Sequence, residues 1–229
     1  MKKLARSMFA RMGYEVRKTS RESRPPAPTA SPPMSRYAHL IELFSKRAPR
    51  RMIEIGVWRG DRSVQFLKKG VKLKRYVGFD LFDDLSEDIA QQEKMGFCNM
   101  SRLEEVEPRL LGARHGDSPT VELMAGPTER TLPEFAEANG PEFDFIYIDG
   151  GHSLETIRND WTYSEKLLAP DGLVVFDDYY PNEAGRGAKP LVDELLQDDR
   201  FEIRFFPMIE DIIDNLQITM VAVSRRDGR

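Results

Sequence analysis

The sequence contains a single cysteine, Cys98, among 229 residues. Since one thiol has no partner within the chain, it can form neither an intramolecular disulfide framework nor a cysteine zinc cluster. This absence favours a reducing compartment, and we expect a cytoplasmic protein.

Long apolar runs are also missing. The best of them, residues 143–148 and 173–176, are short and strand-like, whereas a membrane-spanning helix needs roughly 18 to 20 apolar residues. We therefore expect no transmembrane segment. The dinucleotide motif G-x-G-x-x-G and the P-loop Gly-Lys-Ser/Thr are absent as well, which counts against a nicotinamide cofactor or ATP.

The composition is that of an ordinary globular protein. Hydrophobic residues make up 40% of the chain and charged residues 31%, which excludes collagen-like and wholly disordered chains. The length favours one folded core with an appendage.

The charge is unevenly distributed. Residues 1–36 contain nine Lys and Arg against Glu15 and Glu22, a net charge of +7, so that the remainder carries −11 of the total of −4. An acidic body disfavours a nucleic-acid enzyme, because a surface that binds phosphates is usually basic.

Residues 1–35 are predicted to form a basic N-terminal tail that ends in a Pro-rich linker, and residues 36–229 the folded domain. The first 18 residues place apolar side chains at helical spacing between Lys and Arg. Peripheral contact with an anionic membrane, a partner-binding helix, an organelle transit peptide and a solvated extension all stay open for the tail.

From Arg51 onward, short apolar runs alternate with amphipathic stretches, a pattern typical of a parallel sheet covered by helices on both faces. We predict an α/β fold, a Rossmann-like doubly wound seven-stranded sheet that is mostly parallel, with the last strand antiparallel. The expected strands are residues 51–56, 75–80, 120–125, 143–148, 172–177, 201–206 and 217–224. The expected helices are residues 37–46, 61–69, 86–95, 100–112, 129–138, 153–168 and 190–198.

In such a sheet ligands bind beyond the carboxyl ends of the strands. The first strand ends in Glu54 and Gly56, and Gly60 and Ser63 follow at a helix start. Glycines allow a tight turn and close approach of a ligand, and the N–H groups of a helix start bind an anionic carboxylate. A tight turn with no ligand is the alternative.

The second strand ends in Asp80, followed by Leu81. An acid in this place commonly accepts both hydroxyls of an adenosine ribose; an exposed loop acid is the alternative. The third strand leads to Gly126 and Thr128, whose neighbourhood is predicted to border an adenine ring.

Acidic residues follow the fourth and fifth strands. Asp149 is followed three residues later by His152, and the fifth strand ends in Asp177 and Asp178. If these strands are neighbours, three carboxylates meet, and a cation is the simplest compensation for their repulsion. Oxygen ligands select Mg²⁺ before Mn²⁺ or Ca²⁺. Alternatively, the acids cap the following segments and His152 is an ordinary loop residue.

With these residues in place, the sequence resembles class I S-adenosylmethionine-dependent methyltransferases over nearly all of residues 37–226. The order and spacing of its motifs carry the resemblance: Glu54-x-Gly56-x-x-x-Gly60, Asp80, residues 148–152 and residues 168–172 leading into Asp177-Asp178. More narrowly, it is similar to the metal-dependent sugar O-methyltransferases of the macrocin, mycinamicin and aminocoumarin type.

The resemblance implies S-adenosylmethionine as cofactor together with Mg²⁺ or Mn²⁺. The metal would be held by Asp149, Asp177 and Asp178, and catalysis would involve His152 as general base and Asp149. The implied cofactor-binding residues are Glu54, Gly56, Gly60, Ser63, Asp80, Leu81, Gly126, Thr128 and Asp149.

The expected acceptor is a hydroxyl of a sugar, of a glycosylated natural product or of a cell-surface glycan. The loop 179–187 is predicted to act as a lid over it, with Tyr179 and Tyr180 stacking on a sugar face, and residues 82–118 to shape its pocket. Two alternatives are a catechol or phenol O-methyltransferase of the same fold and a non-catalytic subunit of a glycan-assembly complex. Homo-oligomerisation also stays open.

Overall fold

The computed structural model describes residues 35–84, 86–92, 101–212 and 215–226. The tail and linker predicted for residues 1–35 lie outside this range, except for Ser35. The Ser35 hydroxyl accepts a hydrogen bond from the backbone N–H of Ala38 at 3.2 Å and caps helix α2 (Arg36–Arg47). The division of the chain after residue 35 stays a prediction.

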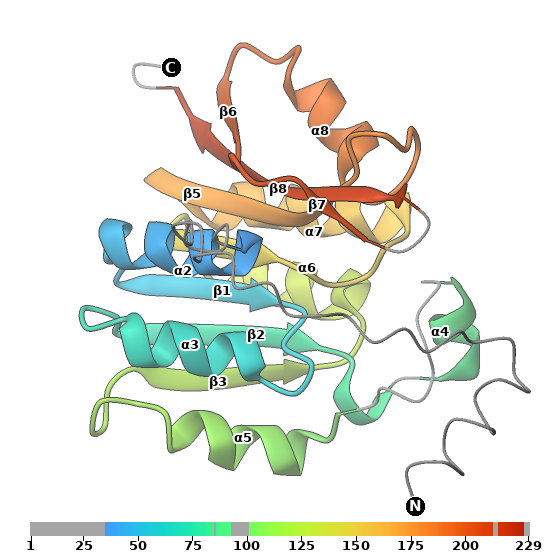
Figure 1. Ribbon diagram of the computed structural model, residues 1–229. Coiled ribbons are helices and arrows are strands. Elements are labelled where there is room, and N and C mark those ends of the chain that lie inside the picture. The colour runs from blue at the N-terminus through green and yellow to red at the C-terminus, as the bar shows by residue number, and fades with distance from the viewer. Residues whose placement is uncertain (1–34, 85, 93–100, 213–214, 227–229) are drawn as a thin grey trace, which may run out of the picture. The chain divides into compact units, whose positions relative to one another are not determined.

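Within the described residues, one sheet has the strand order β3-β2-β1-β4-β5-β8-β6 (Figure 1). The parallel strands are β1 (Arg51–Ile55), β2 (Arg75–Asp80), β3 (Thr120–Ala125), β4 (Phe143–Ile148) and β5 (Leu168–Tyr179). Strand β8 (Gln217–Arg225) pairs antiparallel with β5 and with β6 (Phe201–Phe205), and the short β7 (Glu210–Asp211) pairs with β8. The predicted fold class is confirmed.

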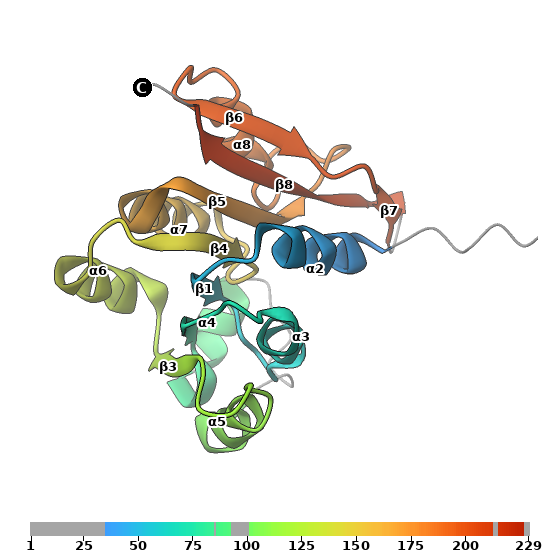
Figure 2. The same cartoon turned by 90° about the vertical axis from the view of Figure 1, so that its left-hand side faces the viewer.

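Helices cover both faces of the sheet, as Figure 2 shows. Helices α2, α3 (Asp61–Lys69) and α5 (Leu103–Leu111) lie on one face. Helices α6 (Thr128–Ala138), α7 (Leu154–Leu167) and α8 (Lys189–Leu195) lie on the other. The 3₁₀ turn η1 (Phe82–Asp84) and helix α4 (Glu87–Gln92) follow β2.

Alternate residues of the central strands point to opposite faces, which divides the hydrophobic core in two. In β4, Ile146 packs on the α6 and α7 side, in the same buried cluster as Leu132. Its neighbours Phe145 and Tyr147 pack on the α2 and α3 side, where both contact the ring of Phe66. The same alternation determines on which face of the sheet the side chains that follow β4 lie.

The predicted elements agree with the structure, with differences of a few residues at their ends. Strand β5 is the main exception, because it begins at Leu168, where it pairs with Phe143. Strand β7 was not predicted, since two residues show no periodic pattern. Among the described residues, no helix combines the length and the apolar character required to cross a membrane.

The strand order reverses between β1 and β4, and ligands bind at such a point in doubly wound sheets. Here the ends of the two strands are joined, because the backbone N–H of Asp149 donates to the carbonyl of Ile55 at 2.8 Å. Gly56 has a φ of +92°, and a Cβ atom on it would lie 1.9 Å from the carbonyl oxygen of Asp149. The close approach of these strand ends therefore requires glycine at this position.

We expect Gly56→Ala to lower the free energy of unfolding by about 3 kcal/mol or more, because the added methyl group forces the ends of β1 and β4 apart. Urea denaturation measures the change. Gly140→Ala is the matched control, since a Cβ atom there meets nothing within 4 Å, and it should change stability by less than about 1 kcal/mol. Equal stability of the two variants would contradict the close approach.

Candidate functional site

The predicted site residues lie at the carboxyl ends of the parallel strands. Gly56 and Gly60 belong to the turn from β1 to α3, and Gly60 precedes the first residue of that helix with a φ of +77°. The N-terminus of α3 therefore points its backbone N–H groups toward the β1/β4 reversal point. This is the geometry expected for binding a carboxylate.

Glu54 lies beneath this turn and is fully buried. Its carboxylate accepts a hydrogen bond from the hydroxyl of Tyr76 at 2.5 Å. Burial raises the pKa of Glu54 to about 7, although the hydrogen bond from Tyr76 opposes the rise. Ser63 of α3 is buried as well. Both side chains are therefore part of the interior of the fold and are not exposed on the surface of the site.

Asp80 joins the loops that follow β1 and β2. Its carboxylate accepts the backbone N–H of Trp58 at 2.6 Å and that of Phe82 at 3.0 Å. Burial raises the pKa of Asp80, and backbone N–H groups from both loops oppose the rise. Trp58 has a φ of +49° and is 43% exposed, which places an indole beside the acid.

The end of β3 is joined to the same rim. The backbone N–H of Gly126 donates to the carbonyl of Asp80 at 2.9 Å. Gly126 is buried, with a φ of +121°, and Thr128, the first residue of α6, is partly exposed two residues later. Leu81, also partly exposed, follows Asp80 directly.

The structure brings Asp149 and Asp177 together through one tyrosine. Asp149 lies two residues after Tyr147, and the Tyr147 hydroxyl lies 2.8 Å from Oδ2 of Asp149 and 3.0 Å from Oδ2 of Asp177. A hydroxyl carries one hydrogen, so it cannot donate to both carboxylates. Burial and the charges of Asp177 and Asp178 raise the pKa of Asp149 well above its ordinary value.

A bulge in β5 places Asp178 at the same edge. The pairing of β5 with β8 shifts between Phe176 and Tyr179, and the extra residue interrupts the strict alternation of side chains. Nε2 of His152 lies 3.0 Å from Oδ2 of Asp178, and the Tyr180 hydroxyl donates to Oδ1 at 2.9 Å.

The His152 contact also affects the acidity of Asp178. Burial would raise the pKa of Asp178, but the contact with His152, the hydrogen bond from Tyr180 and the charge of Arg36 together outweigh burial and lower it. A neutral imidazole that donates from Nε2 has its basic lone pair on Nδ1. The contact therefore fixes the tautomer of His152.

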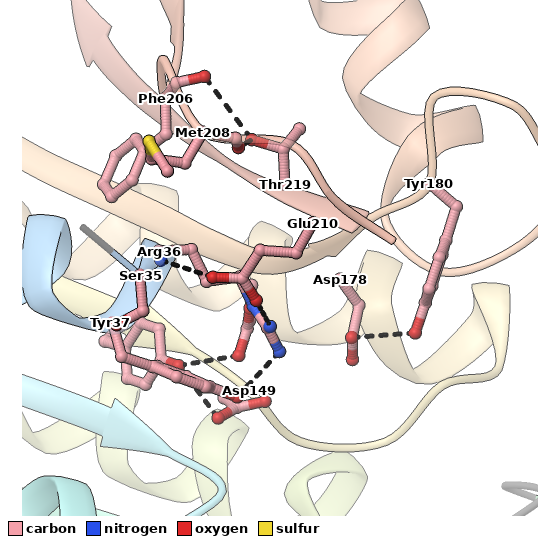
Figure 3. A network of polar contacts seen from close by, with 12 residues as sticks. Ser35, Arg36, Tyr37, Asp149, Asp178, Tyr180, Phe206, Met208, Glu210 and Thr219 are labelled. Atoms are coloured by element: carbon pink, nitrogen blue, oxygen red, sulfur yellow. Dashed lines mark hydrogen bonds and ion pairs between the residues drawn. The ribbon is translucent and has the colours of Figure 1, made fainter. Parts of the chain in front are cut away.

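Asp149, Asp177 and Asp178 form an acidic cluster at the ends of β4 and β5. Helix α2 supplies a cation to this cluster, as Figure 3 shows. Nε of Arg36 donates to Oδ1 of Asp177 at 2.9 Å, its Nη1 pairs with Glu210 of β7, and its Nη2 donates to the hydroxyl of Tyr37 at 2.9 Å. Burial opposes the charge on Arg36, but Asp177 outweighs burial and raises the pKa of the guanidinium. The charge of Arg36 is therefore permanent.

The predicted magnesium ligands are already engaged by protein donors. Arg36 donates to Asp177, the hydroxyl of Tyr147 donates to either Asp149 or Asp177, and His152 contacts Asp178. Over the part of the chain that the structure describes, no group of three or more His, Cys, Asp or Glu side chains is arranged to hold a metal ion. The donor set in this arrangement does not fit a divalent cation.

The predicted stacking role of the tyrosines is wrong. Tyr179 and Tyr180 are only 7% and 4% exposed. Tyr179 donates to Asp193 of α8 at 3.1 Å, and Tyr180 faces Asp178. Because both rings are buried and both hydroxyls are bonded within the fold, neither ring presents a free face to a sugar.

Sequence reasoning missed Arg36, Tyr147 and Glu210. Arg36 lies where a linker meets a helix, a place where cations are usually solvated, and Tyr147 lies within an apolar strand. One signal was present in the sequence: Tyr147 and Asp149 are two residues apart, and such residues share a face of a strand.

The buried Glu54 should make stability depend on pH. Its pKa is about 7 in the folded chain against an ordinary value of 4.5. Between these values the folded state binds more protons than the unfolded state, so the free energy of unfolding falls as pH rises. The difference between the two pKa values corresponds to at most about 3 kcal/mol in the free energy of unfolding. Glu54→Gln should remove this contribution to the decline.

Urea denaturation from pH 4 to pH 8 measures the effect. Glu107→Gln is the control, because Glu107 is exposed on α5, and its profile should run parallel to that of the wild type. If the profile of Glu54→Gln also ran parallel to that of the wild type, the pH dependence of stability would not come from protonation of Glu54.

Comparisons with known proteins identify the family and the fold. The model of a family described as "Methyltransferase domain" matches residues 53–179, more than half of the chain. The curated O-methyltransferase hkm8 of Aspergillus hancockii is 25% identical over 148 residues, which are 65% of this chain and 50% of that protein. The chain thus spans about half the length of this relative.

Solved structures share the fold. The O-methyltransferase TomG from Streptomyces achromogenes, in complex with SAM, has a TM-score of 0.60 at 18% identity, over 85% of this chain and 83% of TomG. An O-methyltransferase from Bacillus cereus, in complex with SAH, has a TM-score of 0.55 at 18% identity, over 87% of this chain and 84% of its own. The match to the family model extends from β1 to the end of β5 and includes the glycine turn, Asp80 and the three acids, and the chain belongs to this methyltransferase domain family.

Proposed function

We propose that this protein is an S-adenosylmethionine-dependent O-methyltransferase that acts on a hydroxyl group of a small molecule. Membership of the methyltransferase family supports the reaction class. Relatives named as O-methyltransferases support oxygen as the methyl acceptor. The observation that carries the proposal is the pair His152 and Asp178, which lies at the same sheet edge as the glycine turn.

The residues at the rim fit the methyl donor. The N–H groups at the start of α3 suit its carboxylate, and Glu54 and Ser63 support the turn from which that helix begins. The carboxylate of Asp80 at the end of β2 would accept the ribose hydroxyls. When bound, S-adenosylmethionine supplies an electrophilic methyl group on a sulfonium.

The adenine ring is assigned to the neighbourhood of Gly126. Gly126 presents no side chain, and Leu81 and Thr128 flank it with partly exposed side chains. The exposed indole of Trp58 offers a further apolar face near Asp80. Together these residues would enclose a flat ring near the ends of β2 and β3, and β1 and β4 separate these strands from β5 in the sheet.

His152 is proposed as the general base. A hydroxyl is a poor nucleophile while protonated, so the imidazole of His152 would take its proton as the new carbon–oxygen bond forms and the bond from the methyl group to the sulfonium breaks. Asp178 orients the ring through Nε2 and stabilises the imidazolium that results. Asp149 and Asp177 would border the acceptor and hold it near the methyl group.

The acceptor class proposed from the sequence is a hydroxyl of a sugar or of a glycosylated compound. A sugar offers adjacent hydroxyl donors, and the carboxylates of Asp149 and Asp178 are suitable acceptors for them. We derive no step through Mg²⁺, because Arg36 pairs with Asp177 and, among the described residues, no group of three or more His, Cys, Asp or Glu side chains is arranged to hold a metal ion.

The test is methyl transfer from radiolabelled S-adenosylmethionine to matched panels of glycosides, sugar nucleotides, catechols and other phenols. Each panel is assayed with excess Mg²⁺ and with EDTA. Transfer to glycosides supports the proposed acceptor, transfer to phenols alone supports the flat-acceptor alternative, and absence of S-adenosylmethionine binding by calorimetry would favour a non-catalytic subunit.

We expect His152→Ala to lower kcat by about 100-fold or more, since it removes the proton acceptor, while the affinity for S-adenosylmethionine stays unchanged. Asp178→Asn should also lower kcat, because an amide does not stabilise an imidazolium. His115→Ala is the control, as this residue contacts the carbonyl of Lys68 at the opposite end of α3. Wild-type turnover in His152→Ala would remove this residue from the mechanism.

A further inference from the structure

Asp149, Asp177 and Asp178 lie close together at the ends of β4 and β5. Asp177 is 1% exposed and Asp178 15% exposed, and Asp149 shares a tyrosine hydroxyl with Asp177. Glu210 approaches the same place from β7. Carboxylates crowded in this way need a cation or protons to remain folded together.

Arg36 supplies a permanent positive charge at this place. Its side chain is 13% exposed and lies between Asp177 and Glu210. The backbone N–H of Arg36 also donates to Oε1 of Glu210 at 2.7 Å. Main chain and side chain of one residue thus contact the same carboxylate, which fixes both the helix start and the guanidinium.

The neighbouring residue reinforces this position. Two guanidiniums contact the ring of Tyr37, with the Cζ atom of Arg36 4.3 Å and that of Arg62 3.7 Å from its centroid. Arg62 belongs to α3, which begins at the glycine turn. The stack therefore connects the helix that starts the domain with the helix that follows the first strand.

We propose that Arg36 is a positioning residue that serves as the built-in cation of the acidic cluster, in the place where a divalent metal ion would otherwise neutralise it. Its guanidinium engages Asp177 through a directional N–H group and holds that carboxylate beside Tyr147. The role in methyl transfer rests on the proposed function, whereas the competition between Arg36 and a metal ion does not.

The physical reason is competition for the same oxygen atoms. A divalent ion would need lone pairs of Asp177 that point at Arg36, and it would meet the full charge of the guanidinium at short range. Removing that charge while keeping the length of the side chain would leave the carboxylates uncompensated. Those carboxylates would then attract a hard cation.

The experiment titrates Mn²⁺ alone into the full chain and follows free Mn²⁺ by electron paramagnetic resonance. The wild type should show no site tighter than the millimolar range, and Arg36→Met should bind Mn²⁺ at least about tenfold more tightly. Arg36→Lys keeps the charge and should behave like the wild type. Arg62→Met removes the second guanidinium that contacts Tyr37 and should leave Mn²⁺ affinity unchanged.

A tight Mn²⁺ site in the wild type would overturn the proposal, and this result does not depend on any variant being folded. Equal Mn²⁺ affinities of Arg36→Met and Arg36→Lys would also overturn it. In methyl transfer, EDTA should leave the wild-type rate unchanged, and Arg36→Lys should retain more activity than Arg36→Met.

Calorimetry with S-adenosylmethionine separates the two proposals. If the cofactor does not bind and the Mn²⁺ results are as expected, the proposed function fails and the role of Arg36 stands. If the cofactor binds and the wild type holds Mn²⁺ tightly, the role of Arg36 fails and the proposed function stands.

Discussion

The arrangement of the site depends on the neutralisation of carboxylates that the sheet brings to one edge. Asp149 and Asp177 share the hydroxyl of Tyr147, Arg36 pairs with Asp177, and His152 contacts Asp178. Each contact uses a donor from a different segment of the chain. Because an uncompensated buried carboxylate is costly, these donors determine how the loops around the site are held.

The fold and the chemistry are linked at the point where the strand order reverses. There the ends of β1 and β4 approach so closely that Gly56 allows no side chain, and the helix that follows directs its N-terminus to the same place. The alternation along β4 and β5 then sends Tyr147, Asp149 and Asp177 to the face that α2 covers. The helix that carries Arg36 is thus also the helix that covers this half of the core.

The sequence predicted much of this site. The positions of Asp149, Asp177 and Asp178 after two apolar strands were sufficient to place them together, because the carboxyl ends of neighbouring parallel strands lie at one edge of a sheet. The source of the compensating charge could not be predicted in this way. A metal ion and Arg36 satisfy the same electrostatic demand, and Arg36 is more than 100 residues away from the acids in the chain.

Local pattern and motif order by themselves determined the alternating strands and helices, the antiparallel last strand, the glycine turn and the family to which the chain belongs. These properties depend on residues that are close in sequence or on the spacing between strand ends. Tertiary structure decided the burial of Tyr179 and Tyr180, the contact of His152 with Asp178 and the pairing of Arg36 with Asp177. Such contacts join side chains from separate segments, and their geometry is set by how the helices pack on the sheet, which no local pattern encodes.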